Sequence, residues 1–134
     1  MAQWRETFLS DATKVTALDQ PLRAGEIIGG DLRNMRDEDL GDIEDVVIGA
    51  SGEIRYVIVS TGGFIGFGEE EVPVPWSDLK VTAAPYRDTF VLDVSKEAFS
   101  DAPRVDDSLR SQLATGERND EVEGFWDDAL GEAS

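Results

Sequence analysis

The stretch that decides the fold lies near the middle of the chain and reads Gly62-Gly63-Phe64-Ile65-Gly66-Phe67-Gly68, then Glu69-Glu70-Glu71, then Val72-Pro73-Val74-Pro75-Trp76. Its four glycines allow the first part to turn sharply, because glycine adopts positive φ without a steric penalty from a Cβ atom. Three large apolar side chains stand among these glycines, and exposed apolar clusters are uncommon on soluble proteins. The stretch therefore predicts a loop that either plugs its own core or contacts a partner.

The residues after this loop alternate in a way that predicts an edge strand. Val72, Val74 and Trp76 face one way, and Pro73 and Pro75 face the other way. Proline has no N–H with which to join a hydrogen-bond ladder, so it is confined to edge strands, strand starts and bulges. We therefore expect this strand at an edge or seam of the sheet.

Two further strands precede the loop. Asp42–Ile48 and Ile54–Ser60 are joined by Gly49–Gly52, which predicts a hairpin with a short loop. The second strand is apolar on both faces of its pleat except at Arg55. A strand covered on both faces is typical of the middle of a closed or strongly curled sheet.

The rest of the central region also favours β-structure. Glu26–Leu32 predicts a first strand with a bend at its glycine pair, Asp37–Gly41 a turn, and Thr89–Val94 a last strand. Ser95 is suited to cap a short helix that ends before Pro103. Short strands at this spacing indicate a small barrel or sandwich. We expect an all-β fold, a small six-stranded β-barrel with short flanking helices.

The order and spacing of these segments resemble the PRC-barrel family. This family is named after the cytoplasmic part of the photosynthetic reaction centre H subunit, and the same barrel forms the C-terminal domain of the ribosome-maturation factor. The resemblance implies a barrel that tends to pair with itself or with a larger assembly, and it implies no shared reaction. The matching segments are Ile28-Gly29, Leu40–Val47, Arg55–Ser60, the glycine loop, Val74–Leu79, Val94–Glu97 and Ala102-Pro103.

Composition divides the chain into three parts, with the barrel assigned to residues 22–103. Residues 1–21 form a leader in which Trp4, Phe8 and Leu9 could share one face of a short helix. Residues 104–134 form an acidic tail. The barrel is expected to fold without that tail.

The tail carries an apolar stripe. Between residues 120 and 134 there are six acidic residues and no basic one, and the spacing of Val122, Phe125, Trp126 and Leu130 places them on one helical face. Such a segment predicts an amphipathic helix that docks either on its own barrel or on a partner.

The charge of the chain limits the kinds of partner that it can bind. It contains 29 acidic and 12 basic residues and has a formal net charge of −17. A field of this sign repels phosphate backbones, so we expect no direct binding of nucleic acid. Two readings of the acidity stay open: solubility in a salty cytoplasm, or a surface matched to a basic protein partner.

The sequence predicts no catalytic, cofactor-binding or metal-binding residue. Cysteine and histidine are both absent, which excludes thiolate nucleophiles, histidine triads and thiolate or imidazole metal sites. The glycine loop lacks the Gly-Lys-Ser/Thr ending of a phosphate loop and runs into three glutamates. No apolar run approaches the roughly 18 residues of a membrane helix, so we expect a cytoplasmic protein without membrane contact.

These observations predict a noncatalytic interaction or scaffold module that forms a homodimer. One alternative is an accessory factor of ribonucleoprotein assembly, acting in ribosome or RNA processing through a basic protein partner. A second alternative is a small enzyme without histidine or cysteine. The candidate interface residues are Phe64, Ile65, Phe67, Pro73, Pro75, Trp76, Phe125 and Trp126.

Overall fold

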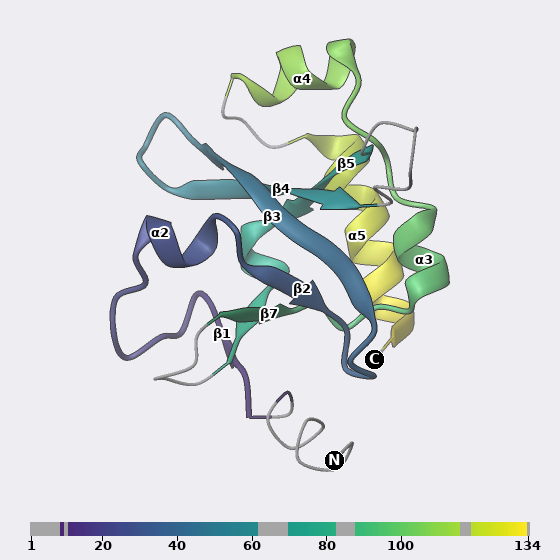
Figure 1. Ribbon diagram of the computed structural model, residues 1–134. Helices are drawn as coiled ribbons and strands as arrows, with labels where there is room; N and C mark the ends of the chain where they lie inside the picture. Colours follow the sequence, from purple (N-terminus) through teal and green to yellow (C-terminus); the bar gives the residue numbers. More distant parts are fainter. Residues whose placement is uncertain (1–8, 10, 62–69, 83–87, 116–118, 134) are drawn as a thin grey trace.

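The computed structural model describes residues 9, 11–61, 70–82, 88–115 and 119–133. Within these residues, seven strands form one sheet in the order β1-β6-β7-β2-β3-β4-β5. Strands β2 and β7 run parallel, and the other neighbouring pairs are antiparallel. The strands are β1 (Thr13–Lys14), β2 (Asp31–Arg33), β3 (Asp39–Ile48), β4 (Ile54–Thr61), β5 (Glu70–Pro75), β6 (Lys80–Val81) and β7 (Thr89–Val91) (Figure 1).

The fold is rich in β-structure, but it differs from the predicted all-β, six-stranded barrel in the number of strands and in its helices. The sheet has seven strands and is mixed, and β1 and β5 lie at its two ends without pairing to each other among the described residues. Proline at two positions of β5 removes donors that a closing strand would need. Helices also accompany the described sheet: α2 (Ala24–Ile27), the 3-10 helix η1 (Trp76–Asp78), α3 (Lys96–Ser100), α4 (Asp107–Leu113) and α5 (Asp120–Ala133).

Helix α2 replaces the beginning of the strand predicted over Glu26–Leu32. The side chain of Glu26 accepts a hydrogen bond from the backbone N–H of Arg23 at 3.0 Å, which holds the first turn of α2. Gly29 follows with a φ of +91°, a conformation that glycine adopts at little cost. The strand itself, β2, therefore begins only at Asp31.

The turn between β2 and β3 comes earlier in the chain than predicted. Arg33 donates from Nε to the carboxylate of Asp31 at 2.7 Å and from Nη1 to the carbonyl oxygen of Asp37 at 3.0 Å. The hydrogen bond that Arg33 donates to Asp31 raises the pKa of Arg33 above its ordinary value. With the turn held in this way, β3 starts at Asp39, within the predicted turn Asp37–Gly41.

The predicted hairpin and the predicted helix cap are confirmed. Strands β3 and β4 pair along their length and are joined by the turn that contains Gly52, whose φ is +89°. Ser95 caps α3, because its hydroxyl oxygen accepts a hydrogen bond from the backbone N–H of Ala98 at 3.1 Å. Strand β5 lies at the end of the sheet, as its prolines predict.

One face of the β4–β5 pair forms the centre of the hydrophobic core. Four valines of these strands face inward in two cross-strand pairs, and all are completely buried. They pack within the same core as residues of β2, β3 and β7. The valines are Val57, Val59, Val72 and Val74, and the residues from the other strands include Leu32, Ile43 and Phe90.

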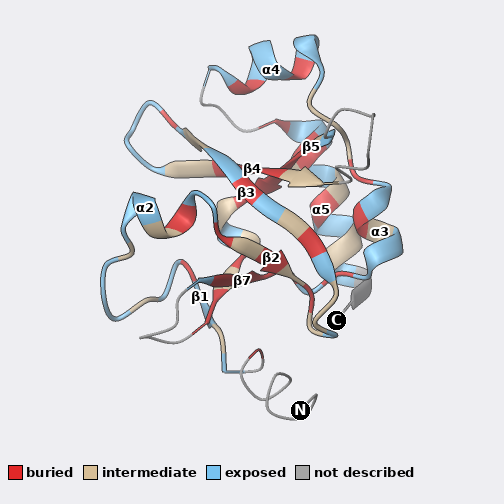
Figure 2. Cartoon of the chain, in the orientation of Figure 1, coloured by how far each residue is buried: buried red, intermediate tan, exposed pale blue. Residues whose placement is uncertain are grey.

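Helix α5 covers the opposite face of the same two strands. Tyr56 and Ile58 alternate with the inward valines of β4 and are buried, as are Pro73 and Pro75 of β5. The burial colours of Figure 2 show the buried side of α5 behind these strands. Strand β4 is therefore covered on both faces, as its sequence predicts, but the second cover is a helix.

Segments on both sides of the predicted barrel contribute to its core. At the C-terminal end, Leu109 and Leu113 of α4 and Val122 and Trp126 of α5 are at most 6% exposed. At the N-terminal end, β1 pairs with β6, and Val15 joins the core. The structure thus shows one core that extends beyond residues 22–103 in both directions.

Candidate functional site

The predicted interface residues fall into three groups. Phe64, Ile65 and Phe67 lie outside the described residues. Buried within the chain are Pro73, Pro75 and Trp126. Partly exposed are Trp76 and Phe125.

The outer edge of β5 is occupied by the chain itself. The carbonyl oxygen of Glu71 accepts a hydrogen bond from the N–H of Val105 at 2.8 Å, and that of Pro73 accepts one from Nε1 of Trp126 at 2.8 Å. Because the N–H and C=O of one strand residue point to the same side, residues 71, 73 and 75 share this edge. Two of these three are prolines without an N–H, so the edge offers little to a further strand.

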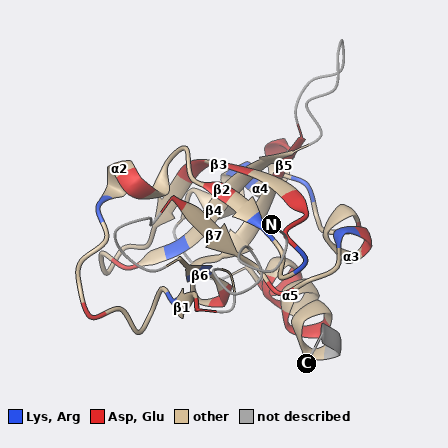
Figure 3. Cartoon of the chain, turned by 60° about the horizontal axis from the view of Figure 1, so that its bottom comes forward, with Lys and Arg blue, Asp and Glu red and all other residues tan. Residues whose placement is uncertain are grey.

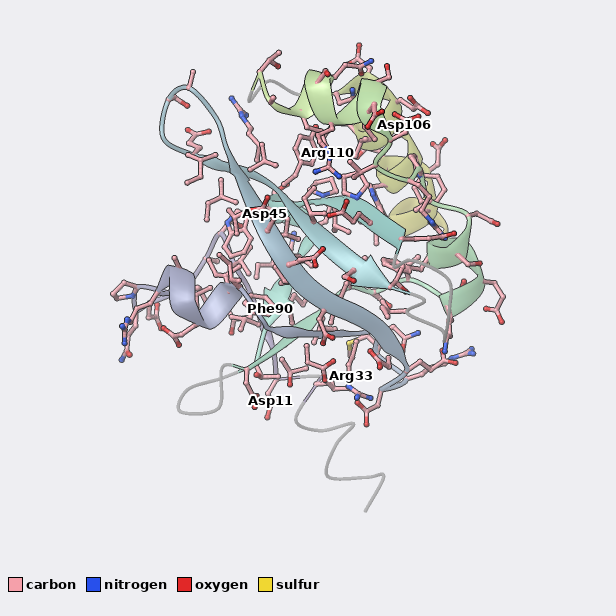
Figure 4. The ribbon with its side chains drawn as sticks, turned by 45° about the horizontal axis from the view of Figure 1, so that its top comes forward. Asp11, Arg33, Asp45, Phe90, Asp106 and Arg110 are labelled. Atoms are coloured by element: carbon pink, nitrogen blue, oxygen red, sulfur yellow. The ribbon has the colours of Figure 1, made fainter. Side chains whose placement is uncertain are left out.

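Aromatic contacts and ion pairs hold the C-terminal segment on this side. The ring of Trp126 lies 5.8 Å from that of Phe99 and 4.9 Å from that of Phe125, the latter pair edge to face. Arg110 reaches from α4 toward the sheet and pairs with Glu71 (Figure 4). The aromatic residues of the predicted tail therefore serve intramolecular packing.

Trp76 lies at the end of β5, where the strand passes into η1. Its carbonyl oxygen accepts the N–H of Leu79, which closes the single turn of η1. Its ring lies 6.3 Å from that of Phe90, at an angle of 50°, which anchors it on the core. The rest of the side chain is partly exposed.

Two cavities meet at Trp76, and together they form what we call the Trp76 groove. The first has a volume of about 540 Å³ and the second of about 370 Å³, and Thr16 and Trp76 line both. The first is also lined by Glu53, Ile54, Arg55, Tyr56, Pro75, Ser77 and Glu123. The second is also lined by Val15, Leu18, Asp19, Gln20, Pro21 and Leu22.

Arg55 is the cationic residue of the groove, and its guanidinium is incompletely satisfied. Nη1 lies 3.9 Å from a carboxylate oxygen of Glu53, at the limit of an ion pair. Nε is buried, and no hydrogen-bond partner for it is present among the described residues. Buried polar atoms without a partner are unusual in folded proteins, so this N–H is an unsatisfied donor inside the fold.

The sequence contains one signal for this groove, although the candidate residues do not include it. Arg55 is the only charged residue in the apolar strand Ile54–Val59. Thr16 and Glu123, which line the same cavity, are distant from it in the chain, so no local pattern brings them together. Of the predicted interface residues, Pro75 and Trp76 line the groove.

Other kinds of site find little support in the described residues. In these parts of the chain, no group of three or more histidine, cysteine, aspartate or glutamate residues is arranged to hold a metal ion. No helix in them has both the length and the apolar character needed to span a bilayer.

Comparison with known families agrees with this architecture. A sequence model of the PRC-barrel domain matches residues 21–99, more than half of the chain. The chain belongs to the PRC-barrel domain family. Membership suggests a protein-interaction module as the class of function. No curated protein matches the sequence. The PRC-barrel match ends before α4 and α5, whose residues nevertheless share its core.

Proposed function

We propose that this PRC-barrel protein is a noncatalytic interaction module that binds a basic partner protein through the Trp76 groove. The observation that carries the proposal is the composition of the groove. It brings together Arg55 and Trp76, both partly exposed, and arginine and tryptophan are among the residue types most enriched in the energetic centres of protein interfaces. The side chain of Arg55 is 31% exposed and, among the described residues, makes only a 3.9 Å contact with Glu53, so its guanidinium can also donate to a partner.

The charge of the chain supports a basic partner. The net charge is −17, and acidic side chains are spread over α2, α3, α5 and β3 in Figure 3. Complementary charge accelerates association and disfavours partners of the same sign. The same field opposes direct binding of nucleic acid, so the proposed partner is a protein.

We also propose self-association, but through fewer surfaces than the sequence alone suggests. The covered outer edge of β5 leaves few free groups for pairing with a second copy. A homodimer would therefore use a surface other than this edge, and a contact through Phe64, Ile65 and Phe67 stays a prediction.

Site-specific photocrosslinking in the native cell tests the proposal. Ser77 is exposed and lines the groove, so a photoreactive amino acid at this position would reach a bound partner. Asp93 is exposed and does not line either cavity, which makes it the control position. We expect one basic protein to crosslink from position 77 and not from position 93. The crosslink should disappear in a Trp76→Ala background that still gives the circular dichroism spectrum of the folded protein.

The opposite results would contradict the proposal. If the same proteins crosslink from both positions, capture reflects general acidity and not the groove. If the crosslink from position 77 persists without the indole of Trp76, the groove does not bind the partner.

A further inference from the structure

We infer that the Trp76 groove binds an extended segment of the partner that carries an arginine, with its guanidinium on the indole of Trp76 in the cavity lined by Glu53 and Glu123. This inference rests on the proposed function and names the chemistry that the groove recognises.

The charge distribution along the groove favours a cation. Carboxylates line both cavities, Glu53 and Glu123 in the first and Asp19 in the second. Among the described lining residues Arg55 is the only basic one, and its Nη1 lies 3.9 Å from a carboxylate oxygen of Glu53. The described part of the lining therefore carries three negative charges and one positive charge, which complements a cationic side chain.

The aromatic surface favours arginine over lysine. Trp76 is held from one side by Phe90 and contributes to the lining of both cavities. Tryptophan is the strongest aromatic partner of a cation, and a planar guanidinium can stack on it while its N–H groups remain free for carboxylates. An ammonium group is a more strongly hydrated point charge and loses more on leaving water.

The extent of the groove and the donor of Arg55 favour a peptide segment over a single small cation. Two cavities that share Thr16 and Trp76 provide room for residues on either side of the arginine. The side chain of Arg55 is 31% exposed and makes only a 3.9 Å contact with Glu53 in the described part of the chain, so a backbone carbonyl of the segment can accept from its guanidinium without adding charge. An arginine-containing segment presents both a cation for the carboxylates of the groove and a neutral backbone acceptor for Arg55.

Nuclear magnetic resonance provides a direct readout, because the chain has three tryptophans and hence three indole N–H signals. The indole of Trp126 is bonded to the carbonyl of Pro73 inside the protein and serves as an internal control. The probe is a glycine–serine peptide that contains a pair of arginines. Matched peptides carry citrulline, lysine or glutamate at the same positions, and free arginine is titrated separately.

We expect the arginine peptide to move the Trp76 signal in a saturable manner and to leave the Trp126 signal in place. The citrulline and glutamate peptides should bind at least several-fold more weakly, and the lysine peptide should lie between them and arginine. Glu53→Gln and Glu123→Gln should each weaken the arginine peptide about 2- to 5-fold, the range for a partly exposed ion pair. Glu97→Gln is the matched control, because it removes one negative charge from the first turn of α3, outside the groove, and should leave binding unchanged.

Several results would overturn the inference. A Trp76 signal that does not move, or that moves equally with citrulline, would exclude recognition of the guanidinium charge. A Glu97→Gln effect as large as that of Glu53→Gln would assign binding to the general field. Free arginine as effective as the peptide would make the groove a small-molecule site. If the photocrosslink from position 77 still depends on Trp76 in any of these cases, the inference fails while the proposed function stands.

Discussion

The face of β4 and β5 under α5 and the Trp76 groove are both built around a tryptophan next to strand β5. Trp126 is completely buried, and its indole N–H donates to a backbone oxygen of β5. Trp76 follows the last residue of β5, is partly exposed, and lines two cavities. The comparison separates a tryptophan whose contacts are completed within the chain from one whose surroundings leave space and charge for a partner.

The largest expected loss of stability comes from removing the segment that contains Trp126. Deleting everything after Arg118 removes Val122 and Trp126 from the core and uncovers Tyr56. We expect loss of the cooperative fold, because the deletion costs more than a single large core truncation, which is about 3–5 kcal/mol, and native stabilities are about 5–15 kcal/mol. This reverses the expectation from sequence that the barrel folds without the tail.

Thermal unfolding followed by circular dichroism measures this effect. The control is a chain that ends after the last described residue of α5, Ala133. A cooperative transition of the shorter chain within a few degrees of the control would show that α5 is dispensable for folding. Trp126 would then be no more necessary for the fold than Trp76.

Substituting the tryptophans singly gives the next largest effect. Trp126→Ala should lower the free energy of unfolding by about 3–5 kcal/mol, since it leaves a cavity and an unpaired carbonyl at Pro73. Trp76→Ala should cost about 1 kcal/mol, the centre of the range for point substitutions, because part of that side chain is already in water. Urea unfolding of the two variants side by side measures the difference. Equal losses would mean that Trp76 is as structural as Trp126.

The smallest effect is expected for the ion pair between α4 and β5. The side chain of Arg110 is 59% exposed where it meets Glu71. Exposed pairs contribute about 0.2–1 kcal/mol, so Arg110→Gln should lower stability by no more than this amount. A double-mutant cycle with Glu71→Gln, at low and high salt, isolates the coupling between them. A coupling well above this range that does not depend on salt would show that charge, and not apolar packing, holds α4 in place.

Local patterns predicted those features that depend on neighbouring residues. The β3–β4 hairpin follows from alternation around a glycine turn, and the place of β5 follows from Pro73 and Pro75, which cannot donate. The cap of α3 follows from Ser95. Helix α2 was missed because Ile27 and Ile28 resemble a strand, while the hydrogen bond from the backbone N–H of Arg23 to the side chain of Glu26 settles the conformation.

Features that depend on distant residues could not be predicted in the same way. The apolar stripe of α5 is visible in the sequence. The place where α5 docks is set by hydrogen bonds from Asn119 to Tyr56 and from Trp126 to Pro73, which span 63 and 53 residues. The short strands β1 and β6 have two residues each, too few for any periodicity. The groove likewise needs Thr16, Arg55 and Glu123 to meet, and only Arg55 stands out locally.

The closed edge of β5 also bears on how the chain avoids aggregation while it folds. The cover provided by α5 exists only once that helix has docked, whereas the prolines at 73 and 75 are present as soon as the strand is synthesised. A bare strand edge recruits other chains through its free N–H groups, and these two positions have none. Strand β5 is therefore protected first by its covalent structure and later by its folded neighbour. Replacing both prolines with valine would leave the nascent sheet unguarded during that interval.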